Sequence, residues 1–141
     1  MYATLADIET SIGPERLSRI ADRENTGVID AAVVDDAILR ASAEIDAAVG
    51  QRYRLPFSTT PTVLRDICVE LAIYIMARDP DEDQRLRVKA ARDRLADLRD
   101  GRTALTDAAL AGTDDEPSAS GAGADLARVR PFTSGLDMRG F

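Results

Sequence analysis

The sequence contains no histidine and no tryptophan, and Cys68 is its single cysteine. The lack of histidine excludes Ser-His-Asp triads, histidine general bases and zinc sites of the HExxH type. A single cysteine cannot form a disulfide within the chain, and it is typical of proteins in reducing compartments. The acidic pairs of the chain are neighbours in sequence, and adjacent residues on a helix do not converge on a substrate. We therefore predict that the protein is not an enzyme and that it has no catalytic residues and no cofactor.

Aromatic residues are also scarce, at 4% of the chain, and no long apolar run is present. The longest apolar stretch, residues 69–77, is too short to span a bilayer, so we expect no contact with a membrane. Because alanine is abundant and aromatic residues are few, the composition favours closely packed helices over a sheet. The predicted fold class is all-α: a small helical bundle of about four to five helices with an extended C-terminal tail.

The formal net charge of the chain is −7. A general affinity for nucleic acid is therefore not expected, because such binding depends on Lys and Arg side chains that neutralise phosphates. The negative charge leaves one narrower relation to DNA open. A ring of acidic subunits lets DNA pass through its channel without binding it.

Apolar residues recur at helical spacing in five segments, and residues that favour helix ends mark their limits. The predicted helices cover 4–13, a short turn of helix from 14, 30–49, 61–78 and 81–100. Thr4 and Asp7 form a capping-box pattern, and Thr60 supplies an N-cap before Pro61 at the first helical position. The segment 61–78 is apolar almost all round, so we expect this helix to be the central one.

The loop 22–30 resembles the calcium-binding loop of an EF-hand. Oxygen-bearing side chains occupy its positions 1, 3, 5 and 9, and Gly27 occupies position 6. At position 12, where an EF-hand has a bidentate glutamate, this chain has Val33. Because the loss of those ligands removes most of the affinity for Ca²⁺, we predict no metal site and favour a tight turn at Gly27 with a helix cap at Asp30.

The loop that follows the 30–49 helix is a first candidate for partner binding. Arg52, Tyr53 and Arg54 join cationic and aromatic groups in one short segment, and Arg and Tyr are favoured at interface hot spots. An equally weighted interpretation is that Tyr53 and Phe57 close over the core.

The helix 81–100 carries a second candidate, a basic stripe beside its buried apolar stripe. The stripe consists of Arg85, Lys89, Arg92 and Arg99. One interpretation is a solvated flank with Asp93 and Asp97 as partners. The other is a contact with an acidic surface on a neighbouring subunit.

The composition changes near residue 112, where the Ala-rich pattern gives way to Gly, Ser, Asp and Pro. We interpret residues 1–111 as a helical domain, 112–124 as a flexible tether and 125–141 as a docking strap that completes its fold on a partner. The expected anchors of the strap are its apolar and arginine side chains: Leu126, Arg128, Val129, Arg130, Phe132, Leu136, Met138 and Phe141.

The order of several motifs resembles a family of Mu-like phage and prophage neck proteins. The chain contains DRENTGVID, SAEID and RYRLP in that order, followed by PTVLRDICVELAIYIM and by a charged helix that ends in LRDG. The resemblance covers about residues 1–105. The family's short C-terminal segment is extended here by the Gly/Ser-rich tail.

The resemblance implies a structural virion protein, a head-to-tail connector (adaptor) subunit. Its implied partners are the portal protein, neighbouring copies of itself in a ring of about twelve, and downstream stopper or tail proteins, with DNA passing through unbound. Its implied location is the virion neck, after assembly in the host cytoplasm. Two alternatives stay open: a tail-terminator or tail-completion protein, and a stand-alone helical binding module, with or without a response to Ca²⁺.

Overall fold

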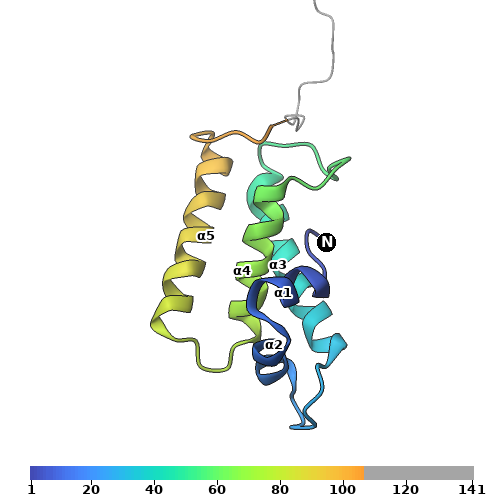
Figure 1. The fold of residues 1–141 in the computed structure, drawn as a ribbon. Coiled ribbons are helices and arrows are strands. Elements are labelled where there is room, and N and C mark those ends of the chain that lie inside the picture. Colours follow the sequence, from blue (N-terminus) through green and yellow to red (C-terminus); the bar gives the residue numbers. More distant parts are fainter. Residues whose placement is uncertain (107–141) are drawn as a thin grey trace, which may run out of the picture. The chain divides into compact units, whose positions relative to one another are not determined.

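The computed structural model describes residues 1–106, which form five α-helices and no strand (Figure 1). The helices are α1 (Leu5–Ile12), α2 (Pro14–Ala21), α3 (Ala31–Val49), α4 (Thr62–Met76) and α5 (Glu82–Asp100). The predicted all-α bundle is therefore confirmed. The proposed tether 112–124 and strap 125–141 lie outside the described residues.

Two helix starts have the side-chain caps that the sequence predicts, at Thr4 and Asp30, and the start of α5 has a further side-chain cap at Asp81. The Thr4 hydroxyl accepts the backbone N–H of Asp7, whose carboxylate accepts the N–H of Thr4. Asp30 accepts the N–H of Ala32, and Asp81 forms a second capping box with Gln84. These bonds satisfy N–H groups that the first turn of a helix otherwise leaves without an acceptor.

The limits of α4 differ from the prediction at both ends. Its N-cap is Pro61, not Thr60, because the Pro61 carbonyl accepts the first N–H groups of the helix while its own backbone is extended, with ψ at 137°. The start of α4 has no side-chain cap. The helix ends at Met76, because the backbone of Ala77 turns to the extended region with ψ at 126°.

The three long helices pack as a bundle in which α4 lies between α3 and α5 (Figure 1). The chain runs along α3, returns along α4 and runs along α5, so α3 and α5 point the same way. The fully buried residues of α4 include Leu64, Ile67, Cys68 and Leu71, which confirms its central position. The short helices α1 and α2 pack against α3, and α1 also packs against α4. Within residues 1–106, no helix is both long enough and apolar enough to cross a membrane.

Candidate partner-binding surfaces

Tyr53 belongs to the core of the bundle. Its side chain is 1% exposed, and its hydroxyl accepts the backbone N–H of Leu105 at 3.0 Å. Phe57 is half-buried, and its ring lies 6.3 Å from that of Tyr53 and 6.2 Å from that of Tyr2. Of the two interpretations of this loop, closure over the core therefore describes Tyr53 and Phe57. Tyr53 is not available to a partner in this structure.

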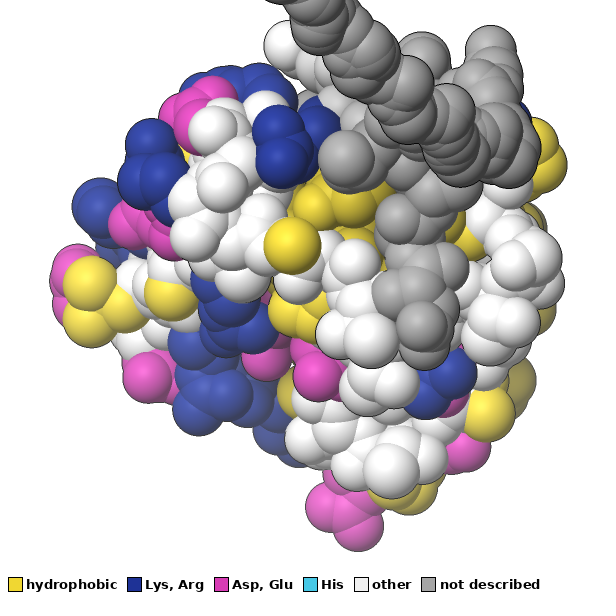
Figure 2. Space-filling view, turned by 90° about the horizontal axis from the view of Figure 1, so that it is seen from above, with side chains coloured by type: hydrophobic (Ala, Val, Ile, Leu, Met, Phe, Trp, Pro, Cys, Tyr) yellow, Lys and Arg dark blue, Asp and Glu magenta, His cyan; other side chains and the backbone are white. Residues whose placement is uncertain are grey.

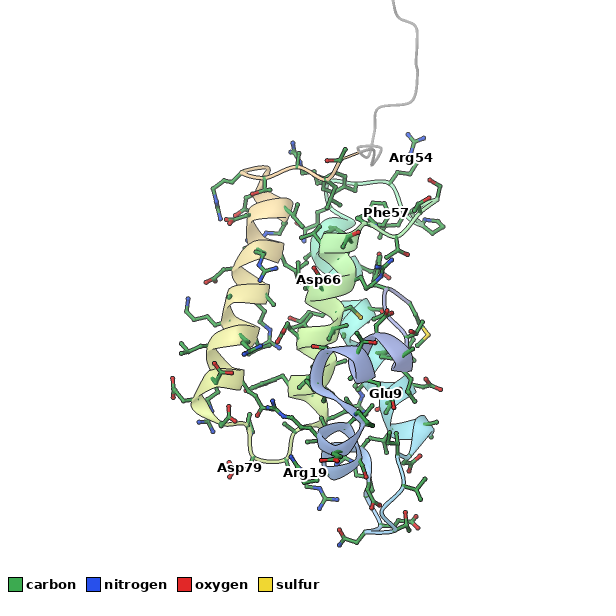
Figure 3. The ribbon with its side chains drawn as sticks, viewed as in Figure 1. Glu9, Arg19, Arg54, Phe57, Asp66 and Asp79 are labelled. Atoms are coloured by element: carbon green, nitrogen blue, oxygen red, sulfur yellow. The ribbon has the colours of Figure 1, made fainter. Side chains whose placement is uncertain are left out.

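The two arginines that flank Tyr53 have different surroundings. Arg54 is exposed at the end of the bundle where α5 ends (Figure 3). The half-buried Arg52 lies against Gly101, where a Cβ atom would come within 2.8 Å of the guanidinium group. Gly101 is the C-cap of α5 and has a left-handed backbone, with φ at 78°. The charge of Arg52 thus lies at the negative end of the α5 dipole, where a cation is stabilising.

Arg92, in the middle of the basic stripe, connects two helices of the same subunit. Its guanidinium group donates to both carboxylate oxygens of Glu44 on α3, at 2.7 and 3.2 Å. It also lies 5.8 Å from the centre of the Tyr74 ring on α4. The hydrogen bond to Glu44 raises the pKa of Arg92 above its usual value. Arg92 therefore contributes first to the packing of α5 on α3.

Two other members of the stripe form local ion pairs on α5. Lys89 contacts Asp93 at 2.8 Å and Arg99 contacts Asp100 at 2.9 Å. Asp97, the other acid expected beside the stripe, pairs instead with Arg102 at 2.7 Å. Exposed pairs of this kind contribute little to stability, so the side chains remain free to exchange partners.

Arg85 is the remaining member of the stripe. It is exposed, and its side chain makes no hydrogen bond or ion pair with any other residue of the described range 1–106. Seen from the end of the bundle, Lys and Arg side chains gather mainly over the side where α5 lies, with Asp and Glu side chains among them (Figure 2). Of the four residues of the predicted stripe, three form ion pairs within the subunit. The side chain of Arg85 has no such partner within residues 1–106.

The structure also exposes two leucines that the sequence analysis did not single out. Leu39 on α3 is 59% exposed and Leu86 on α5 is 57% exposed. Leu86 lies off the apolar stripe of α5, which runs through Val88, Ala91 and Leu95. This departure from the 3.6-residue period was a signal available in the sequence.

The carboxylate of Asp22 in the EF-hand-like loop accepts hydrogen bonds from backbone N–H groups of the same loop. It accepts N–H groups from Glu24, Thr26 and Gly27 at 3.2, 3.0 and 2.5 Å. The hydrogen bonds from Thr26 and Gly27 lower the pKa of Asp22 below its usual value. Across residues 1–106, no three His, Cys, Asp or Glu side chains converge as they would around a metal ion. The bonds to Asp22 account for the shape of the loop, together with the left-handed Gly27 at φ 81°.

The sequence matches the family model described as bacteriophage Mu, Gp36, over residues 2–124. The chain belongs to this Gp36 family. It is 32% identical to gene product J of Escherichia phage Mu over 132 residues, an alignment that covers 92% of this chain and 89% of that protein. It is also 37% identical over 68 residues to the Mu-like prophage FluMu protein gp36 of Haemophilus influenzae, which covers 48% of each protein.

The Gp36 family assignment confirms the resemblance to Mu-like phage and prophage proteins. The match also extends further than expected. It passes residue 105 and takes in the segment 112–124. The alignment with the phage Mu protein covers so much of this chain that it must reach into 125–141 as well.

Proposed function

We propose that this Gp36-family chain is a structural virion protein, a head-to-tail connector (adaptor) subunit that joins the portal to the tail. The observation that carries the proposal is the nearly end-to-end alignment with gene product J of phage Mu, a protein of comparable length. Such an alignment supports a shared role for the whole chain, including its C-terminal region.

The proposed partners are the portal protein, neighbouring copies in a ring of about twelve, and downstream stopper or tail proteins. The chemistry of the subunit supports this role. A helical bundle with a single core is a rigid unit, and its charged helix surfaces offer contacts to neighbours. The net charge of −7 suits a channel, because an acidic wall repels the phosphates of the passing DNA. The proposed location is the neck of the virion, after assembly in the host cytoplasm.

Particles assembled without this chain test the proposal. We expect filled heads and complete tails of normal length that remain separate, because the component that joins them is missing. Tails of abnormal length would instead assign the chain to the tail as a terminator. Joined, infectious particles would contradict both roles.

A further inference from the structure

The two exposed leucines have pairs of charged side chains of opposite sign beside them, and the first turn of α5 adds the acids Glu82 and Asp83 one turn before Leu86. The α5 surface consists of Leu86 with Arg85 and Lys89, and the α3 surface consists of Leu39 with Asp35 and Asp36. All six side chains are exposed. In Figure 1, α5 lies at one side of the bundle and the first half of α3 lies at the other.

The two surfaces lie at the same height along the bundle. The helices α3 and α5 run in the same direction, and the pair of Arg92 with Glu44 fixes their relative level. Leu39 precedes Glu44 by five residues and Leu86 precedes Arg92 by six, which places them roughly 7.5 and 9 Å below that pair at 1.5 Å per residue. Copies standing side by side at one level therefore bring the two surfaces face to face.

The charges of the two surfaces are available to a partner. The side chains of Arg85 and Asp35 make no hydrogen bond or ion pair with other residues of the range 1–106. Within the same range, Lys89 is paired only with Asp93, and Asp36 only with Arg40, one turn away on the same helix. Both pairs are highly exposed, so their exchange for a partner across an interface costs little.

We propose that the α5 surface of one copy docks against the α3 surface of the next copy, with Leu86 and Leu39 at the centre of the contact. The occupant is a second copy of this chain, because the charges of the two surfaces are complementary and both surfaces are present on every copy. Such a contact is head-to-tail and leaves one surface of each kind free, so further copies add until a ring closes. This inference rests on the proposed function, in which the copies form a ring.

Disulfide trapping tests the contact. The double variant Leu39→Cys/Leu86→Cys is oxidised in two preparations, the concentrated isolated chain and the complex with co-expressed portal protein. We expect a ladder of disulfide-linked dimers, trimers and larger species, because each copy carries both halves of the contact. Each single variant is the matched control and has no partner thiol at this contact. Cys68 is fully buried and does not contribute.

The absence of species above the dimer in both preparations would overturn the inference. Dimers formed by a single variant in place of the ladder would do the same, because they would indicate a symmetric contact. A portal complex that contains many copies but gives no ladder would overturn the contact and leave the proposed function standing. Absence of the chain from the complex would count against the proposed function, and the isolated preparation would still decide the contact.

Charge reversal supplies a second test that does not depend on oxidation. In the double-cysteine chain, Arg85→Asp or Asp35→Arg alone should lower the yield of the ladder roughly fivefold, the range of one exposed ion pair. The two reversals combined should restore it, since every interface then regains an opposite pair. Failure of the combination to restore a ladder that each reversal weakens would contradict the pairing of these surfaces.

Discussion

Tyr53 ties together two loops that are 52 residues apart in the chain. Its ring is in the core, and its hydroxyl accepts a backbone N–H that has little access to water. Arg52 supports the same junction from the side of Gly101. The last described residues after α5 are therefore fixed by side chains of the loop between α3 and α4.

The Tyr53→Phe variant should lower the free energy of unfolding by about 1–2 kcal/mol, because the N–H of Leu105 loses its acceptor inside the protein. Urea denaturation followed by circular dichroism measures the change. Tyr74→Phe is the matched control, since the Tyr74 hydroxyl makes no hydrogen bond within residues 1–106. Equal stability of the Tyr53→Phe variant and the wild type would show that the bond contributes nothing.

Cys68 should be unreactive in the folded protein. Burial raises the pKa of its thiol, and its sulfur lies 3.6 Å from the Ser42 hydroxyl. A raised pKa reduces the fraction of thiolate at any given pH, and the thiolate is the reactive form. At pH 8 we expect labelling by Ellman's reagent to be at least about a hundredfold slower than in urea.

A cysteine introduced at Leu86 provides the internal control for that experiment, because this position is exposed. The Leu86→Cys variant should show one fast and one slow thiol. Rapid labelling of both thiols in the folded chain would contradict the burial of Cys68.

Some residue positions could not be predicted because they depend on distant parts of the chain. The sequence shows that Tyr53 is aromatic and that Arg92 is on a basic stripe, but it does not show where the loop of Tyr53 lies. The partner of Arg92 is Glu44, 48 residues away on another helix. Contacts between neighbours on one helix, such as Lys89 with Asp93, were within reach of the 3.6-residue period.

At the scale of the helices, residues that favour N-caps made it possible to predict where helices begin. Thr4 and Asp30 cap their helices as predicted, because each cap is a local interaction within three residues. The 81–100 helix was predicted as well, but its cap at Asp81 was not. The predicted N-cap of α4, Thr60, was wrong by one residue, because Pro61 itself serves as the N-cap. The central position of α4 followed from its apolar residues on all sides.

The capping box of α5 gives a prediction at this scale. Asp81 accepts the N–H of Gln84 at 2.8 Å, and Gln84 accepts the N–H of Asp81 at 3.0 Å. Asp81→Ala should lower the free energy of unfolding by about 1 kcal/mol, because the backbone N–H of Gln84 loses its side-chain acceptor. Asp79→Ala is the control, since Asp79 is exposed in the preceding turn and has no ion pair or hydrogen bond among residues 1–106 (Figure 3). A loss of the same size in both variants would refute the role of the cap.

At the scale of the whole molecule, residues 1–106 contain a hydrophobic core of their own. Within this described range its buried residues run from Ala3 to Leu105. Deletion of 112–141 should therefore change the melting temperature of the isolated chain by no more than about 2 °C. Attachment to the partner should weaken sharply, because the deletion removes the expected anchors of the strap, Phe132, Met138 and Phe141 among them.

The truncated chain can be compared with the full-length chain by thermal unfolding and by complementation of particle assembly. If the truncated chain supported assembly as well as the full-length chain, the strap hypothesis for 125–141 would fail. A large drop in melting temperature would contradict the independence of the helical domain.

The mass of the purified chain with and without portal protein tests the central proposal most directly. Copies with a charge of −7 repel one another, so a ring needs a template that supplies further contacts. We expect a monomer or weak association for the chain alone at low micromolar concentration, and a complex with many copies per portal ring when the two are mixed. A chain that leaves the mass of the portal unchanged, or that closes into a stable ring by itself, would contradict this account.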